Sequence, residues 1–135
     1  MTHAQQMLKT HPRRSALPEA ALVECIEACL DCSQSCTACA DACLGEEDVG
    51  TVIRCIRLCN DCSDVCATTG RLLSRQTGFE GALVRAVVQA CIELCRACGE
   101  ECARHADHHP HCCVCAEACR GCERACENLV SALAA

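Results

Sequence analysis

The sequence predicts an all-α protein, an antiparallel up-down-up-down four-helix bundle with a short N-terminal helical appendage. Its cysteines recur at alternating intervals of four and three residues, which places them on one face of a helix. The cysteine-bearing segments contain no internal proline and are separated by short turn signals, so consecutive helices run antiparallel. Three segments repeat one pattern, since LVECIEACLDCSQSC, VIRCIRLCNDCSDVC and VVQACIELCRACGEEC share a CxxxCxxC core.

The chain begins with a polar stretch, residues 1–17, which we expect to form one or two helical turns outside the bundle. The metal-binding side chain types in this stretch are Met1, His3, Met7 and His11. The bundle domain is expected to comprise residues 18–135. Its first helix covers residues 18–44, because Pro18 suits a first helical turn and Gly45 follows the end.

Three further helices complete the expected bundle. The second covers residues 48–75, with Asp48 as its N-cap. Thr77 and Glu80 make a capping-box pattern that opens the third helix, which runs to about residue 107. After a histidine-rich turn, Pro110 begins the fourth helix, which covers residues 110–132.

Cysteine occupies the positions where leucine and isoleucine normally form a bundle core. Side chains of this size cannot fill such a core to normal density, so packing alone does not explain the pattern. Cβ atoms four residues apart on a helix are separated by about 5–6 Å, too far for a disulfide, but neighbouring thiols can share a metal ion. The predicted metal ligands are Cys25, Cys29, Cys32, Cys36, Cys39, Cys43, Cys55, Cys59, Cys62, Cys66, Cys91, Cys95, Cys98, Cys102, Cys112, Cys115, Cys119, Cys122 and Cys126, together with Cys113, which lies off the pattern.

The two ends of the predicted bundle differ in chemistry. Beyond the cysteines of each helix, the cysteine-bearing face continues with apolar or small residues. In the antiparallel arrangement these residues meet at one end of the bundle. These residues are Leu22, Thr69, Leu73, Val84, Val88, Leu129 and Leu133. At the opposite end the face of the third helix continues from Cys102 to His105 and His109, with His111 following. We therefore expect a closed apolar end and an open end lined by imidazoles.

The composition excludes several classes of function. The formal charge is −6, and there is one Phe and no Trp or Tyr, so a nucleic-acid partner is not expected. The N-terminal stretch lacks the apolar run of a signal peptide, and no window reaches the roughly 18 apolar residues of a membrane span. We therefore expect a cytosolic protein with no membrane partner. No nucleophile–base pair is visible, so no catalytic residue and no enzymatic activity are predicted.

Thiolate ligands select Cu(I), Zn(II) or iron–sulfur clusters. Twenty thiolates filled four at a time would hold about five Zn(II) ions and leave about ten uncompensated negative charges in the core. One Cu(I) per cysteine replaces each thiol proton with one monovalent cation, so the net charge of the core does not change. The pattern therefore favours several Cu(I) ions per chain. The alternatives are a zinc- or cadmium-sequestering protein and a redox or iron–sulfur electron-transfer protein.

Cysteines lining all four helices from Cys25 to Cys126, with histidines gathered at one end, resemble the bacterial cytosolic copper storage proteins. The resemblance implies a homotetramer of four-helix bundles in which Cu(I) ions are held along the core by thiolates, often bridged between cysteines. Copper would arrive from small thiols or a copper chaperone and pass inward by ligand exchange.

The resemblance also implies roles for particular residues at the open end. His105, His109 and His111 are expected to form the uptake site. Asp61 or Asn60 is expected to contribute a contact to copper that is not a thiol.

Overall fold

The computed structural model describes residues 2–134. Within this range the chain consists of helices and turns, without a strand. The elements are α1 (Ala4–Thr10), α2 (Glu19–Leu44), the short 3₁₀ helix η1 (Val49–Thr51), α3 (Ile53–Leu73), α4 (Gly81–His105) and α5 (Pro110–Ala134). None of the helices described combines the length and apolar character that crossing a membrane requires.

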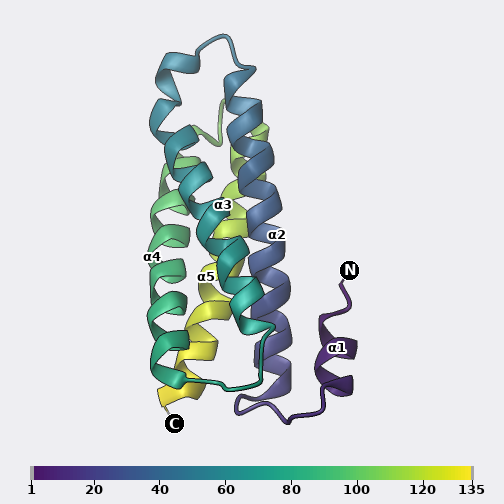
Figure 1. The fold of residues 1–135 in the computed structure, drawn as a ribbon. Helices are drawn as coiled ribbons and strands as arrows, with labels where there is room; N and C mark the ends of the chain where they lie inside the picture. Colours follow the sequence, from purple (N-terminus) through teal and green to yellow (C-terminus); the bar gives the residue numbers. More distant parts are fainter. Residues whose placement is uncertain (1, 135) are drawn as a thin grey trace.

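Helices α2 to α5 form a four-helix bundle with up-down-up-down connectivity, which confirms the predicted fold class (Figure 1). Helix α2 packs against α3 and α5, and α4 packs against the same two helices. The predicted N-terminal appendage is α1, which lies outside the bundle against α2 (Figure 1). At the start of α1 the hydroxyl of Thr2 donates a 2.7 Å hydrogen bond to the Glu27 carboxylate of α2.

The predicted start of the second helix is wrong. Asp48 precedes η1, and the α-helix α3 begins only at Ile53. Between them lies Val52, whose side chain is fully buried and whose carbonyl oxygen accepts the N–H of Ile56. Burial of Val52 therefore sets where the chain turns into α3, and it leaves the Asp48 side chain free to face another element.

The predicted capping box before the third helix does not form. Helix α4 begins at Gly81, and no side chain caps its N-terminus. Gly78 has a φ angle of +72°, a left-handed conformation that a right-handed helix excludes. The chain therefore turns at this glycine, and Thr77 lies outside the helix that it was expected to open.

The interior of the bundle is lined by sulfur along most of its length. All the cysteines except Cys113 are buried, nearly all of them with no exposed surface. The expected apolar end also forms, because the residues assigned to it are buried or partly buried. They are Leu22, Thr69, Leu73, Val84, Val88 and Leu129, which are buried, and Leu133, which is partly buried.

Small residues hold pairs of helices close together. Between α2 and α3, the Ser33 hydroxyl donates to the Ser63 carbonyl oxygen at 3.0 Å, and the Ser63 hydroxyl donates to the Ser33 carbonyl oxygen at 2.9 Å. Between α4 and α5, a Cβ atom added at Gly99 would lie only 3.3 Å from the Cβ atom of Cys119. These close approaches bring sulfur atoms of neighbouring helices within reach of one another.

Candidate metal centre

Sulfur atoms from different helices meet along the axis of the bundle. Neighbouring Sγ atoms lie 3.6 Å apart in the pair Cys25 and Cys126, and 4.0 Å apart in the pair Cys32 and Cys62. All twenty cysteines are free thiols. The short separations allow one metal ion to bind two or more sulfurs.

The sulfurs form overlapping groups of four whose ligand atoms all lie within 4.8 Å of one another. Successive groups share members: Cys122 belongs to two of them, as do Cys32, Cys36 and Cys119. Four of the groups consist of thiols alone: Cys29–Cys91–Cys122–Cys126, Cys32–Cys66–Cys95–Cys122, Cys32–Cys36–Cys62–Cys119 and Cys36–Cys98–Cys115–Cys119. Shared sulfurs are the geometry required for ions bridged by thiolates, and for an ion that moves by exchanging one ligand at a time.

His111 is the histidine that reaches the thiols. Its Nδ1 atom lies 3.3 Å from Cys39 Sγ and 3.6 Å from Cys112 Sγ. With Cys43 these residues form a further group within 4.8 Å, made of three sulfurs and one imidazole nitrogen. We call this group the outer site. Its soft donor set suits Cu(I).

Burial affects the thiols of the outer site. It raises the pKa of Cys43 from 9.0 to about 11, with the charge of a neighbouring Cys55 thiolate adding to the effect. Burial also raises the pKa of Cys112. Both groups are therefore neutral thiols near neutral pH, and an arriving ion must displace their protons.

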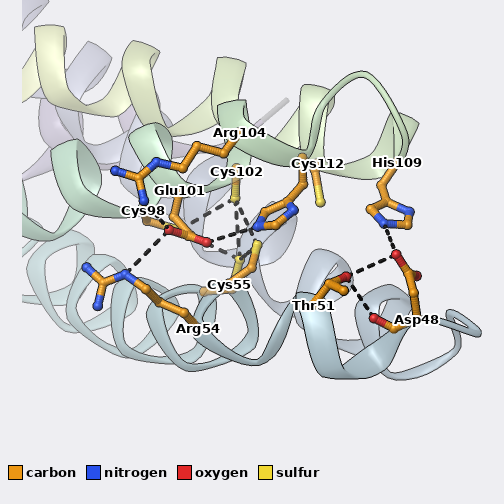
Figure 2. Close-up of polar contacts among 12 residues, drawn as sticks. Asp48, Thr51, Arg54, Cys55, Cys98, Glu101, Cys102, Arg104, His109 and Cys112 are labelled. Carbon is orange, nitrogen blue, oxygen red and sulfur yellow. Dashed lines mark hydrogen bonds and ion pairs between the residues drawn. The ribbon is translucent and has the colours of Figure 1, made fainter.

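His105 is held by a carboxylate. Its Nε2 atom lies 2.9 Å from Oε2 of Glu101, a glutamate with 6% of its surface exposed. The other oxygen of Glu101 is 3.4 Å from Arg54 Nε and 3.3 Å from Arg104 Nη1 (Figure 2). Glu101 thus lies beside His105, Arg54 and Arg104, and these partners compensate the burial of its carboxylate.

His109 links the two turns at this end of the bundle. Its Nε2 atom lies 3.2 Å from Asp48 Oδ2, and Asp48 also accepts a 3.0 Å hydrogen bond from the Thr51 hydroxyl (Figure 2). On the other side of the ring, Nδ1 lies against the carboxylate of Glu46. The Thr51 hydroxyl, with a smaller effect of His109, holds the pKa of Asp48 below its ordinary value. The rings of His109 and His111 are stacked with centroids 5.7 Å apart.

A family model described as copper storage protein matches residues 18–131. The chain belongs to the copper storage protein family. The resemblance seen in the cysteine pattern is thereby confirmed. No curated protein matches the chain.

Three solved structures illustrate the similarity. The copper storage protein Ccsp from Streptomyces lividans, loaded with 10 copper equivalents, is 52% identical with a TM-score of 0.94, covering 96% of this chain and 98% of that one. A cytosolic copper storage protein from the same organism, described with five coppers, is 57% identical with a TM-score of 0.82, over 83% and 93% of the two chains. Apo copper storage protein 3 from Bacillus subtilis is 36% identical with a TM-score of 0.68, over 78% and 94%.

Not every predicted site residue of this family member lies with the thiols. The carboxylate of Asp61 accepts a 2.8 Å hydrogen bond from Arg57 Nε, with 41% of the Asp61 side chain exposed, and Asn60 is exposed. The structure therefore does not place either residue among the buried cysteine sulfurs that line the bundle. Cys113 and His108 are exposed as well.

Three carboxylates at this end were not predicted as site residues. Glu101 stands four residues before His105, a spacing that places the two side chains on one face of a helix, so the sequence did carry a signal for this pair. Glu46 and Asp48 contact His109 from a different turn, more than sixty positions away in sequence. No local pattern indicates a contact of that kind.

Proposed function

We propose that the protein stores many Cu(I) ions on the thiolates that line its bundle, and that copper enters at the outer site. The observation that carries the proposal is the overlap of the four-sulfur groups, in which Cys32, Cys36, Cys119 and Cys122 each belong to two groups. Shared sulfurs let an ion pass inward by short ligand exchanges. Relatives of this chain are described as loaded with 10 coppers and with five coppers.

Charge favours a monovalent ion over a divalent one. Neutral buried thiols exchange one proton for one Cu(I), so a filled column carries no added charge. Filling the same sulfurs with Zn(II) in fours would leave about two negative charges at each site, and each uncompensated buried charge costs several kcal/mol.

We also propose where the protein stores copper and from which donors it receives it. The protein acts in the cytosol, as does a Streptomyces lividans relative described as cytosolic. It receives copper from small thiols or a copper chaperone and performs no catalysis. Residues 1–17 act as an appendage to the storage domain, residues 18–135.

Assembly into a homotetramer is part of the same proposal. The support for this part is the family resemblance together with the exposed apolar side chain of Ile53, which has 63% of its surface exposed on the outside of the bundle. Sedimentation equilibrium of the metal-free and loaded protein measures the mass. If both forms were monomers at micromolar concentration, the proposed homotetramer would be ruled out.

Anaerobic titration of the reduced protein with Cu(I) tests the storage function. We expect binding to continue to about one ion per buried thiol, because each thiolate can bridge ions. Saturation at only a few ions per chain would contradict the proposal. A parallel titration with Zn(II) should saturate at about a quarter of that number, since zinc takes four ligands in closed sites.

A further inference from the structure

The carboxylate of Glu46 lies beside two histidines at once. Its Oε2 atom is against His109 Nδ1, and its Oε1 atom is 3.7 Å from His111 Nε2. Both nitrogens are buried, and neither has a hydrogen-bond partner of good geometry. Because buried polar atoms in native proteins are normally satisfied, these two nitrogens depend on the carboxylate next to them.

The backbone holds Glu46 in this place. The N–H group of Glu46 donates a 3.2 Å hydrogen bond to the carbonyl oxygen of Cys43, and the N–H of Gly45 donates to Ala42 at 3.0 Å. The residue is therefore anchored to the last turn of α2, which carries Cys43 of the outer site. Its side chain is positioned by the same element that positions the thiols.

The tautomer of His111 decides whether the outer site can bind copper. A neutral imidazole carries one N–H, and only its other nitrogen has a lone pair for a metal. Nδ1 faces Cys39 and Cys112, so Nδ1 must be free of its proton and Nε2 must carry it. In the opposite tautomer, Nδ1–H would point at the Cys39 sulfur and block the site.

We propose that Glu46 is a positioning residue for copper uptake: its carboxylate oxygen Oε1, 3.7 Å from Nε2 of His111, favours the proton on that nitrogen by its negative charge and so keeps the Nδ1 lone pair directed at the thiols. The inference rests on the proposed function in taking the outer site as the place where Cu(I) arrives. A carboxylate carries a full negative charge and a neutral thiol does not, so the proton of the imidazole is favoured on the nitrogen that faces Glu46. Carboxylates commonly orient metal-binding histidines in this manner.

His109 completes the arrangement from the other side. Its ring stands between Glu46 and Asp48, with the 3.2 Å contact from Nε2 to Asp48 Oδ2 holding the ring in place. One oxygen of the Glu46 carboxylate lies against His109, and the other faces His111. In this arrangement both nitrogens of His109 face carboxylates, and His111 alone is left to face the sulfurs.

Long-range proton–nitrogen NMR of the metal-free, reduced full-length protein, at a pH above neutral where imidazole is uncharged, reads the tautomer directly. We expect His111 in the Nε2–H form, and a shift of its population toward Nδ1–H in Glu46→Ala. Glu47→Ala is the matched control, because Glu47 is the exposed neighbour. Nδ1–H in the parent protein, or a population unchanged by Glu46→Ala, would overturn the proposal.

Stopped-flow loading from a Cu(I) chelator supplies the functional readout. For Glu46→Ala we expect the rate of loading to fall about tenfold or more, the usual size of the effect when such a partner is removed, with total capacity unchanged. Glu46→Gln, which keeps the size of the side chain, should show the same direction. Loading of both variants at the rate of Glu47→Ala would overturn the positioning role.

These outcomes separate the inference from the proposed function. If the parent protein bound only a few Cu(I) ions, the storage function would fail while the tautomer measurement still tested Glu46. If the parent filled normally and the variants loaded as fast as the parent, storage would stand and Glu46 would have no positioning role.

Discussion

His111 lies in the polar part of the open end and contacts the buried sulfurs of the bundle. It stands one position before Cys112 at the start of α5, and its Nδ1 atom also reaches Cys39 on α2, 72 residues earlier. His105 and His109, in contrast, are engaged by Glu101, Glu46 and Asp48. The three imidazoles at this end therefore have different surroundings, and the consequences of replacing them should differ.

Replacing His111 by Ala should slow loading from a Cu(I) donor more than replacing any other histidine, because it removes the nitrogen ligand of the outer site. A His105→Ala/His109→Ala variant should also load more slowly while keeping most of its capacity, since the thiols remain. Stopped-flow kinetics and end-point copper analysis measure the two quantities. His108→Ala, at an exposed position, is the control. Equal rates in all four proteins would remove the uptake role of this end.

At the scale of the helices, small residues decide how closely the sulfurs approach. Gly99 on α4 faces Cys119 on α5, whereas Gly121 on α5 has only the end of the Arg124 side chain within 4.0 Å of an added Cβ atom. The two glycines occupy the interior of helices of equal length, 25 residues each. Substitutions at these two positions therefore distinguish the effect of contact between helices from the effect of helix propensity.

Gly99→Leu should lower the free energy of unfolding of the metal-free protein by about 1–3 kcal/mol, because the larger side chain forces α4 away from α5. Gly121→Ala should raise it by up to about 1 kcal/mol, because alanine favours a helix and meets open space. Urea unfolding under reducing conditions measures both. A Gly99→Leu protein as stable as the parent would contradict the close-packing argument.

Over the whole molecule, the core consists largely of ionisable cysteine thiols, where other helix bundles have aliphatic side chains. At the outer site, burial favours the neutral form of the thiol and raises the pKa of Cys43. Besides burial, the neighbouring thiols Cys55, Cys112 and Cys39 also influence the pKa of Cys43. The stability of the metal-free protein is therefore linked to pH in a way that an aliphatic bundle would not share.

The direction of this linkage follows from the two states. An unfolded thiol has a pKa of 9.0, and folding raises that of Cys43 to about 11, so the folded state retains its proton longer. Below about pH 9 the Cys43 thiol is protonated in both states and adds no pH dependence. Above about pH 9 the unfolded state loses this proton first, so the contribution of Cys43 to stability falls. Urea midpoints from about pH 8 to 10.5 should therefore decrease. Constant midpoints would contradict the expected linkage, and the copper-loaded protein, whose thiols are already deprotonated, is the control.

The periodic spacing of cysteine was sufficient to predict the bundle, its sulfur core and its two unlike ends. Helical periodicity is a local property, so Cys25 and Cys29, or Leu129 and Cys126, share a face whatever the surroundings. The charge that metal ions would bring into the core likewise follows from the number of ionisable sulfurs, which is a property of composition. Asp61, inferred from family resemblance and not from spacing, is found paired with Arg57 on the outer surface.

Tertiary structure alone decided what each histidine faces. His105 continues the cysteine-bearing face of α4, yet its Nε2 atom is taken by Glu101, and the histidine that reaches Cys39 is His111. The contacts of Glu46 and Asp48 depend on how the turn after α2 meets the turn after α4. Turns have no periodicity to reveal their direction, so the sequence determined that thiols line the bundle, and the meeting of two turns decided how its open end is organised.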